Sequence, residues 1–146
     1  MRRYSSGISV VTVEFEGDRF GSTMGSLVSL SLEPPLVGVS VGRQNSLHEP
    51  LRRVRVFGVS ILAADQERLA WWFARSVPPI AQWEGIGVRP GPGPPLLEGA
   101  LGWMRCRVEA EHGVGDHTLF VGAVEALELG ADGQALVYRR SSYGPA

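Results

Sequence analysis

The chain has 146 residues, of which 44% are hydrophobic and 20% are charged, and its formal net charge is −1. This length predicts one domain, residues 1–146, and the charge balance gives no long-range attraction to nucleic acid or to an anionic membrane. The single cysteine, Cys106, excludes an internal disulfide and a cysteine-based zinc site, so a reducing cytoplasm is the expected compartment.

The first half of the chain is predicted to be sheet with one short helix. Residues 7–15 alternate and are rich in Val, Ile and Thr, and a turn follows at residues 16–18, which together predict a hairpin over residues 6–24. Valine-rich strands are predicted at residues 36–41 and 54–62. Residues 46–53 between them are expected to form a short helix capped by Asn45 or Ser46.

The second half adds a longer helix and two long strands. Residues 65–74 are predicted to be helical, with Asp65 as the cap and with an apolar face made of Leu69, Trp72 and Phe73. Residues 78–95 are rich in Gly and Pro and predict a long loop, of the kind that forms lids or interface arms. Strands are predicted at residues 101–112, 118–128 and 136–138. About seven strands with one or two helices favour a mainly β, antiparallel barrel over a doubly wound sheet.

The stretch from Gly21 to Val41 contains many small hydroxyl residues together with Gly21 and Gly25. Such residues let a flat ligand approach the backbone closely and supply hydrogen bonds that bulkier side chains would block. Composition alone favours a plainer explanation, an edge strand followed by a serine-rich turn.

A hydrolase site is considered because Gly38-Val39-Ser40-Val41-Gly42 matches the G-x-S-x-G nucleophile elbow, with Asp116 and His117 downstream. The β-branched residues on either side of Ser40 suit an extended strand and not the sharp turn that an elbow needs. Asp116 and His117 are adjacent, so in an extended segment their side chains would point to opposite sides. We therefore reject the hydrolase. A turn role is predicted for Asp116, with Gly115 at a positive φ.

Metal and nucleic-acid sites are also rejected. His48 and His112 have no carboxylate or histidine partners at ligand spacing, and no basic stripe interleaves with aromatic residues. No uncharged run is long and apolar enough to span a bilayer. An anion site is predicted instead at Arg43, Asn45 and Ser46, because they follow a strand end and precede a helix whose first amides would be free to bind a phosphate.

Several short segments carry a pattern that runs in fixed order along nearly the whole chain. They are residues 6–13 (SGISVVTV), 23–26 (TMGS), 29–37 (SLSLEPPLV), 43–48, 57–74, 94–108, 115–124 and 136–143. Together these segments resemble the flavin reductase-like, FMN-binding split-barrel family. The resemblance implies an antiparallel Greek-key split β-barrel that forms a homodimer, with the flavin bound at the seam between the two subunits.

The resemblance also implies an enzyme, an NAD(P)H:flavin oxidoreductase that reduces FMN or FAD and supplies it to a partner monooxygenase. No G-x-G-x-x-G motif follows a predicted strand, so NADH or NADPH would bind in the flavin cleft itself. Thr23, Met24, Gly25 and Ser26 would edge the isoalloxazine, Ser40, Arg43, Asn45 and Ser46 would hold the ribityl chain and phosphate, and His117 would face the nicotinamide.

Two positions depart from the family pattern, since Leu47 stands where Thr is common and Ser60 where Asn is common. One phosphate contact is thereby put in doubt. A non-catalytic flavin carrier or sensor on the same barrel is the alternative function, and the Gly115-Asp116-His117 triplet favours the reductase.

Overall fold

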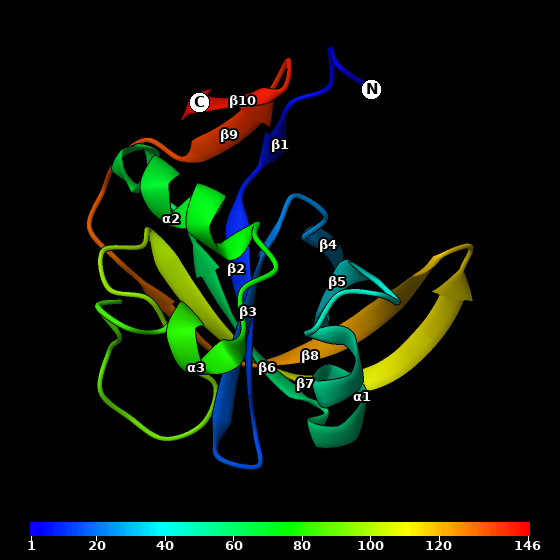
Figure 1. The fold of residues 1–146 in the computed structure, drawn as a ribbon. Helices are drawn as coiled ribbons and strands as arrows, with labels where there is room; N and C mark the ends of the chain where they lie inside the picture. Colours follow the sequence, from blue (N-terminus) through cyan, green and yellow to red (C-terminus); the bar gives the residue numbers. More distant parts are fainter.

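The computed structural model describes residues 1–146 and consists mainly of antiparallel strands (Figure 1). The strands are β1 (Ser6–Gly7), β2 (Ser9–Phe15), β3 (Asp18–Met24), β4 (Val28–Leu32), β5 (Pro35–Gly42), β6 (Val56–Ile61), β7 (Gly102–Val114), β8 (His117–Leu129), β9 (Leu136–Arg139) and β10 (Ser142–Pro145). The helices are α1 (His48–Val54), α2 (Glu67–Phe73), which follows a 3₁₀ turn at Ala64–Gln66, and α3 (Pro79–Gln82).

The main sheet is a barrel that does not close. Its seven strands run in the order β3-β2-β6-β7-β8-β5-β4, so β3 and β4 are the two edges and share no ladder. Only residues 25–27 connect β3 to β4. Because this connection is so short, the sheet must curl until its two edges nearly meet. The chain then crosses from β5 through α1 to β6 on the far side of β7 and β8. The predicted fold class, a mainly β split barrel of antiparallel strands, is confirmed.

Strand β2 is buried on both faces and separates two apolar cores. Val11 and Val13 point into the barrel core, whereas Ile8 and Val10 belong to a second core under α2. This division follows from the period of two along a strand, which sends alternate side chains to opposite faces. In Figure 1, α2, α3 and the small β1-β9-β10 sheet lie around the second core, and α1 lies on the other side of the molecule.

Helix α1 confirms the helix predicted at residues 46–53 to within two residues. Leu47 and Leu51 are fully buried in the barrel core, one turn apart on the same face. The Asn45 side chain caps the entry, since its Oδ1 accepts a hydrogen bond from the Leu47 amide at 2.9 Å. The helix ends at Arg55, which adopts a left-handed conformation with φ of 60°.

Helix α2 confirms the helix predicted at residues 65–74, but the predicted cap is wrong. Asp65 is exposed, and Gln66 acts in its place: its Oε1 accepts from the Ala63 amide at 3.0 Å and its Nε2 donates to the Glu98 carbonyl at 2.8 Å. A glutamine can accept from one backbone group and donate to another, whereas an ionised carboxylate can only accept. The predicted apolar face packs on the second core through Leu69, Trp72 and Phe73.

The Gly/Pro-rich segment 78–95 is tied to the barrel and does not form a free lid. It contains α3, and the Gln82 side chain exchanges two hydrogen bonds with the backbone of Gly21, at 3.2 and 3.0 Å. A Cβ at Gly21 would lie 2.9 Å from the Phe73 ring and 3.0 Å from the Trp83 ring. Gly21 therefore makes room for aromatic packing, and the expectation that it admits a flat ligand is wrong.

The long hairpin of β7 and β8 extends from the body of the barrel as an arm (Figure 1). Its turn contains Gly115 at φ of 58°, which confirms the predicted positive φ. Strand β10 was not predicted, and β1 lies at the start of the segment predicted as a hairpin. The serine-rich segment forms the edge strand β4, as its composition alone favoured. The structure contains no helix with the length and apolar character needed to cross a membrane.

Candidate functional site

The side chains at the end of β3 are used largely by the fold. Thr23 Oγ1 donates to the Ala70 carbonyl at 2.7 Å, which ties β3 to α2. Met24 is buried in the barrel core, with 7% of its surface exposed. Gly25 is exposed, and a Cβ there would come within 2.8 Å of Ser6 Oγ. Of these predicted flavin contacts, the exposed backbone at Gly25 is the part that remains open to a ligand.

Ser26 and Ser40, which are far apart in the sequence, are brought together across the connection between β3 and β4. Ser26 Oγ donates to the Ser40 carbonyl at 3.0 Å and accepts from the Ser40 amide at 3.1 Å. These bonds use the one donor of the Ser26 hydroxyl, while the half-buried Ser40 hydroxyl has no partner within the protein. Ser40 is thus the better placed of the two to contact a ligand through its side chain.

Ser40 also lies within strand β5, paired with Leu119 of β8. The strand continues to Gly42, so the sharp strand-to-helix turn of a nucleophile elbow does not occur at Ser40. The structure agrees with the rejection of a hydrolase.

A polar hollow of about 390 Å³ opens where β5 ends. Its lining residues are Gly42, Arg43, Gln44, Asn45, Asp116 and His117. The Arg43 amide donates to the Asp116 carbonyl at 3.0 Å, which fixes the β5–α1 loop against the β7–β8 turn. Gly42 pairs with His117, two residues beyond Ser40 on the same strand face, or about 7 Å along the strand. Ser40 and the hollow therefore form one continuous polar strip.

Asn45 holds the loop in place. Its Nδ2 donates to Ser22 Oγ at 2.9 Å, which joins the loop to β3, while its Oδ1 accepts from the Leu47 amide. The His48 amide donates to the Asn45 carbonyl at 3.0 Å. The amides of Leu47 and His48 at the start of the helix are therefore occupied and are not free to bind a phosphate. Arg43 is the cationic side chain that this loop offers to an anion.

Arg43 is exposed and forms no ion pair within the protein. Ser46 is also exposed, and its hydroxyl makes no hydrogen bond within the protein. Leu47, the residue that stands where Thr is common, is fully buried. A hydroxyl at that position would face the core, so its loss removes no polar group from the hollow.

His117 begins strand β8 and bonds to its neighbour, Asp116. Its Nδ1 lies 2.7 Å from Asp116 Oδ1, and 46% of the His117 side chain is exposed. The hydrogen bond with His117 lowers the pKa of Asp116 below its usual range. The expectation that these two side chains diverge is wrong because Asp116 lies in the turn after Gly115 and not in extended strand.

Sequence reasoning missed two members of this strip. Gln44 lines the hollow, and Ser22 holds the Asn45 side chain. Gln44 lies between two predicted contacts, so its position in the loop was an available signal. No local signal could have paired Ser22 with Asn45, since only the curl of the sheet brings β3 to this loop. No cluster of three or more His, Cys, Asp or Glu residues is placed to hold a metal ion.

The curled antiparallel sheet, with a polar hollow beside its open seam, defines a split-barrel protein. A family model described as "Flavin reductase like domain" matches residues 1–146. The chain belongs to this family, as the resemblance predicted.

Known proteins similar to this chain carry related names. An "NADH-dependent flavin reductase" of Rhodococcus sp is 40% identical over 144 residues, which cover 97% of this chain and 80% of that protein. The reductase component of 4-hydroxyphenylacetate 3-monooxygenase from Thermus thermophilus is 37% identical over 143 residues, which cover 98% of this chain and 90% of that protein. The crystal structure of BorF, the flavin reductase component of a bacterial two-component tryptophan halogenase, matches with a TM-score of 0.92 at 35% identity. The match covers 99% of this chain and 92% of the BorF chain.

Proposed function

We propose that the protein is an NADH-dependent flavin reductase that reduces FMN or FAD and supplies the reduced flavin to a partner monooxygenase. The observation that carries this proposal is the hollow in which Arg43 and His117 meet beside the Ser40 strand. The family and the names of the relatives support the same activity, and the names favour NADH over NADPH. We propose that residues 1–146 form a single domain that acts in the cytoplasm.

The residues present fit a flavin. A Cβ at Gly42 would lie 3.7 Å from His117 Nε2, so the missing side chain leaves space in front of the imidazole. Arg43 offers an unpaired guanidinium to a phosphate, and the Ser40 hydroxyl has a free donor and acceptor. We propose that the isoalloxazine ring binds beside Gly25 and the phosphate beside Arg43.

The bound flavin accepts a hydride from the nicotinamide, and the residues of the chain bind and orient the two reactants. Arg43 would hold the phosphate, with Ser46 and Asn45 beside it, while Ser40 would contact the ribityl chain. The hydrogen bond between His117 Nδ1 and Asp116 Oδ1 orients the imidazole and leaves Nε2 without a partner within the protein. We infer that Nε2 accepts a hydrogen bond from the carboxamide of the nicotinamide.

Anaerobic mixing of the protein with NADH and FMN is expected to bleach the flavin absorbance in many turnovers, because a reductase releases the reduced product. A stopped-flow spectrophotometer without oxygen measures this directly. A flavin carrier would bind FMN with no NADH-dependent bleaching. That result would overturn the reductase and favour the carrier.

We also propose a homodimer. The edge strand β4, which follows the Gly25–Ser26 connection, exposes the apolar side chains of Val28, Leu30 and Leu32. Of these, Leu32 has 87% of its surface exposed. A second subunit over this edge would cover both the apolar side chains and the open side of the strip.

Sedimentation equilibrium at micromolar concentration is expected to give a dimer, and Leu32→Glu is expected to weaken it because a charge would be buried at the interface. Leu129→Glu is the matched control, since Leu129 is 80% exposed at the end of β8, away from β4. A wild-type monomer with flavin bound would contradict the proposal.

A further inference from the structure

A second hollow adjoins the first, at the base of the β7–β8 arm. Its volume is about 320 Å³, and its lining residues are Arg43, His48, Arg52, Glu111, Gly113 and Thr118. Arg43 is the one residue that lines both hollows. The function proposed above uses only the first hollow.

The position of Arg43 depends on the absence of a side chain at Gly113. A Cβ at Gly113 would lie only 2.9 Å from Arg43 Nη2, so the guanidinium rests over the backbone of β7. From there it borders both hollows. A planar guanidinium has donors along more than one edge and can therefore contact two phosphate groups at once.

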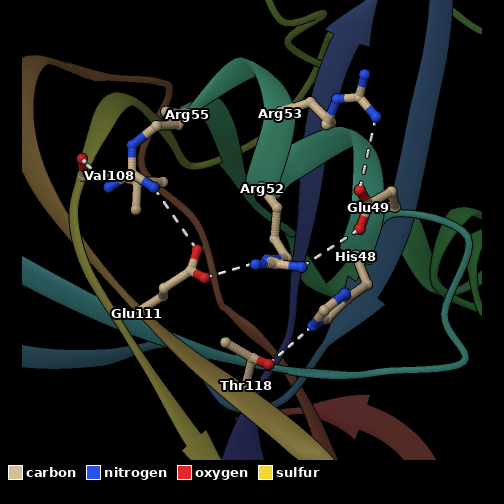
Figure 2. A network of polar contacts seen from close by, with 8 residues as sticks. All are labelled: His48, Glu49, Arg52, Arg53, Arg55, Val108, Glu111 and Thr118. Carbon is tan, nitrogen blue, oxygen red and sulfur yellow. Dashed lines mark hydrogen bonds and ion pairs between the residues drawn. The ribbon is translucent and has the colours of Figure 1, made fainter.

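The charges around the second hollow do not cancel. Glu111 lies between two arginines, at 3.1 Å from Arg52 Nε and 3.6 Å from Arg55 Nη1 (Figure 2). Glu49 lies 3.7 Å from Arg52 and 3.8 Å from Arg53 on the same helix. Among the residues that line the second hollow, two arginines, Arg43 and Arg52, face one carboxylate, Glu111, so the lining keeps a net positive charge that attracts an anion.

The floor of the second hollow offers polar groups without further charge. His48 Nε2 lies 2.8 Å from Thr118 Oγ1, as Figure 2 shows, and the imidazole is almost completely buried. Burial and the nearby Arg52 hold the pKa of His48 below its usual range, so the ring is neutral and the positive charge comes from the arginines. The lining offers an anion the side chains of Arg43, Arg52, His48 and Thr118.

We propose that this second hollow binds one phosphate of a dinucleotide, so that a diphosphate spans the two hollows across Arg43, with Arg52 as the second cationic contact. This inference rests on the proposed function, because it extends the same site. FMN carries a single phosphate and fills only the first hollow. FAD and NADH both contain a diphosphate, and either can be the ligand whose second phosphate occupies the second hollow.

Substitution of Arg52 tests the proposal, with Arg53 as a matched control. Both residues lie on α1 and both pair with Glu49, but only Arg52 lines the hollow, and Figure 2 shows Arg53 directed away from Glu111. The dissociation constants of FAD and FMN are measured by fluorescence without nicotinamide. Steady-state KM values for NADH and for reduced nicotinamide mononucleotide are then measured at saturating FMN.

Arg52→Gln is expected to weaken binding of the dinucleotide by about tenfold, because a charge-assisted hydrogen bond to phosphate is lost at a partly exposed site. Binding of the matching mononucleotide is expected to change by no more than about twofold. If FAD loses affinity and FMN does not, the flavin is the ligand of the second hollow. If the KM rises for NADH and not for reduced nicotinamide mononucleotide, the nicotinamide dinucleotide is the ligand. Arg52→Lys is expected to restore part of the affinity, and Arg53→Gln is expected to change nothing.

The proposal is overturned if dinucleotides and mononucleotides lose affinity equally, if neither loses affinity, or if Arg53→Gln has the same effect as Arg52→Gln. A thermal melt of each variant shows that the measured protein is folded. The proposed function fails separately, and only if the wild type shows no NADH-dependent reduction of FMN.

Discussion

Replacing His117 by alanine is expected to lower kcat/KM for NADH by about tenfold or more, which corresponds to about 1.4 kcal/mol of transition-state stabilisation. The imidazole is half exposed, and its one side-chain hydrogen bond is to Asp116 in the turn. It contributes little to the core, so the melting temperature and the FMN affinity should barely change. Its expected contact is with the nicotinamide alone.

Steady-state kinetics over a range of NADH at saturating FMN, with a thermal melt of the same sample, decide this prediction. Asp116→Asn is an informative companion, because an amide can still accept from Nδ1–H but no longer carries the charge that favours this tautomer. An unchanged kcat/KM together with a lowered melting temperature would assign His117 to the turn.

Replacing Leu47 by alanine is expected to lower the free energy of unfolding by about 2 to 5 kcal/mol, the usual cost of truncating a fully buried leucine. Leu47 is completely buried in the barrel core and directly follows the loop that carries Arg43 and Asn45. Truncation removes the apolar anchor of that loop, so FMN affinity is expected to fall as well.

Urea denaturation followed by circular dichroism measures the change in unfolding free energy. The matched control is Leu127→Ala, because Leu127 is 64% exposed on β8 and its truncation should change stability by no more than about 0.5 kcal/mol. If Leu47→Ala lowers the free energy of unfolding by no more than Leu127→Ala does, Leu47 is not the anchor of the loop.

The strands and helices with a strong local signal were predictable. Alternation along β2 and β3 and the turn at Glu16-Gly17 specify a hairpin, and the apolar spacing in α2 specifies its buried face. Local patterns could not identify the cap of α2, because Asp65 and Gln66 both suit that place. Gln66 is selected by the Glu98 carbonyl, which a separate part of the chain supplies.

The glycine and loop residues show why some functional predictions were wrong. Gly21 has the same local signature whether it admits a ligand or an aromatic ring, and the choice is made by Phe73 and Trp83 from distant segments. The segment 78–95 has the composition of a lid, yet Gln82 and Gly21 bind each other across 61 positions of sequence. Only the folded chain brings these groups into contact.

The sequence by itself determined the chemistry available at the site: hydroxyls at Ser26 and Ser40, an arginine in the loop after β5, and an imidazole after a glycine turn. The tertiary structure decided how these groups are used. It bonded the amides of Leu47 and His48 to Asn45, turned Asp116 toward His117, and placed Arg43 between two hollows. The reason is physical, since residue type fixes which bonds a group can form, whereas the curl of the sheet fixes which partners lie within reach.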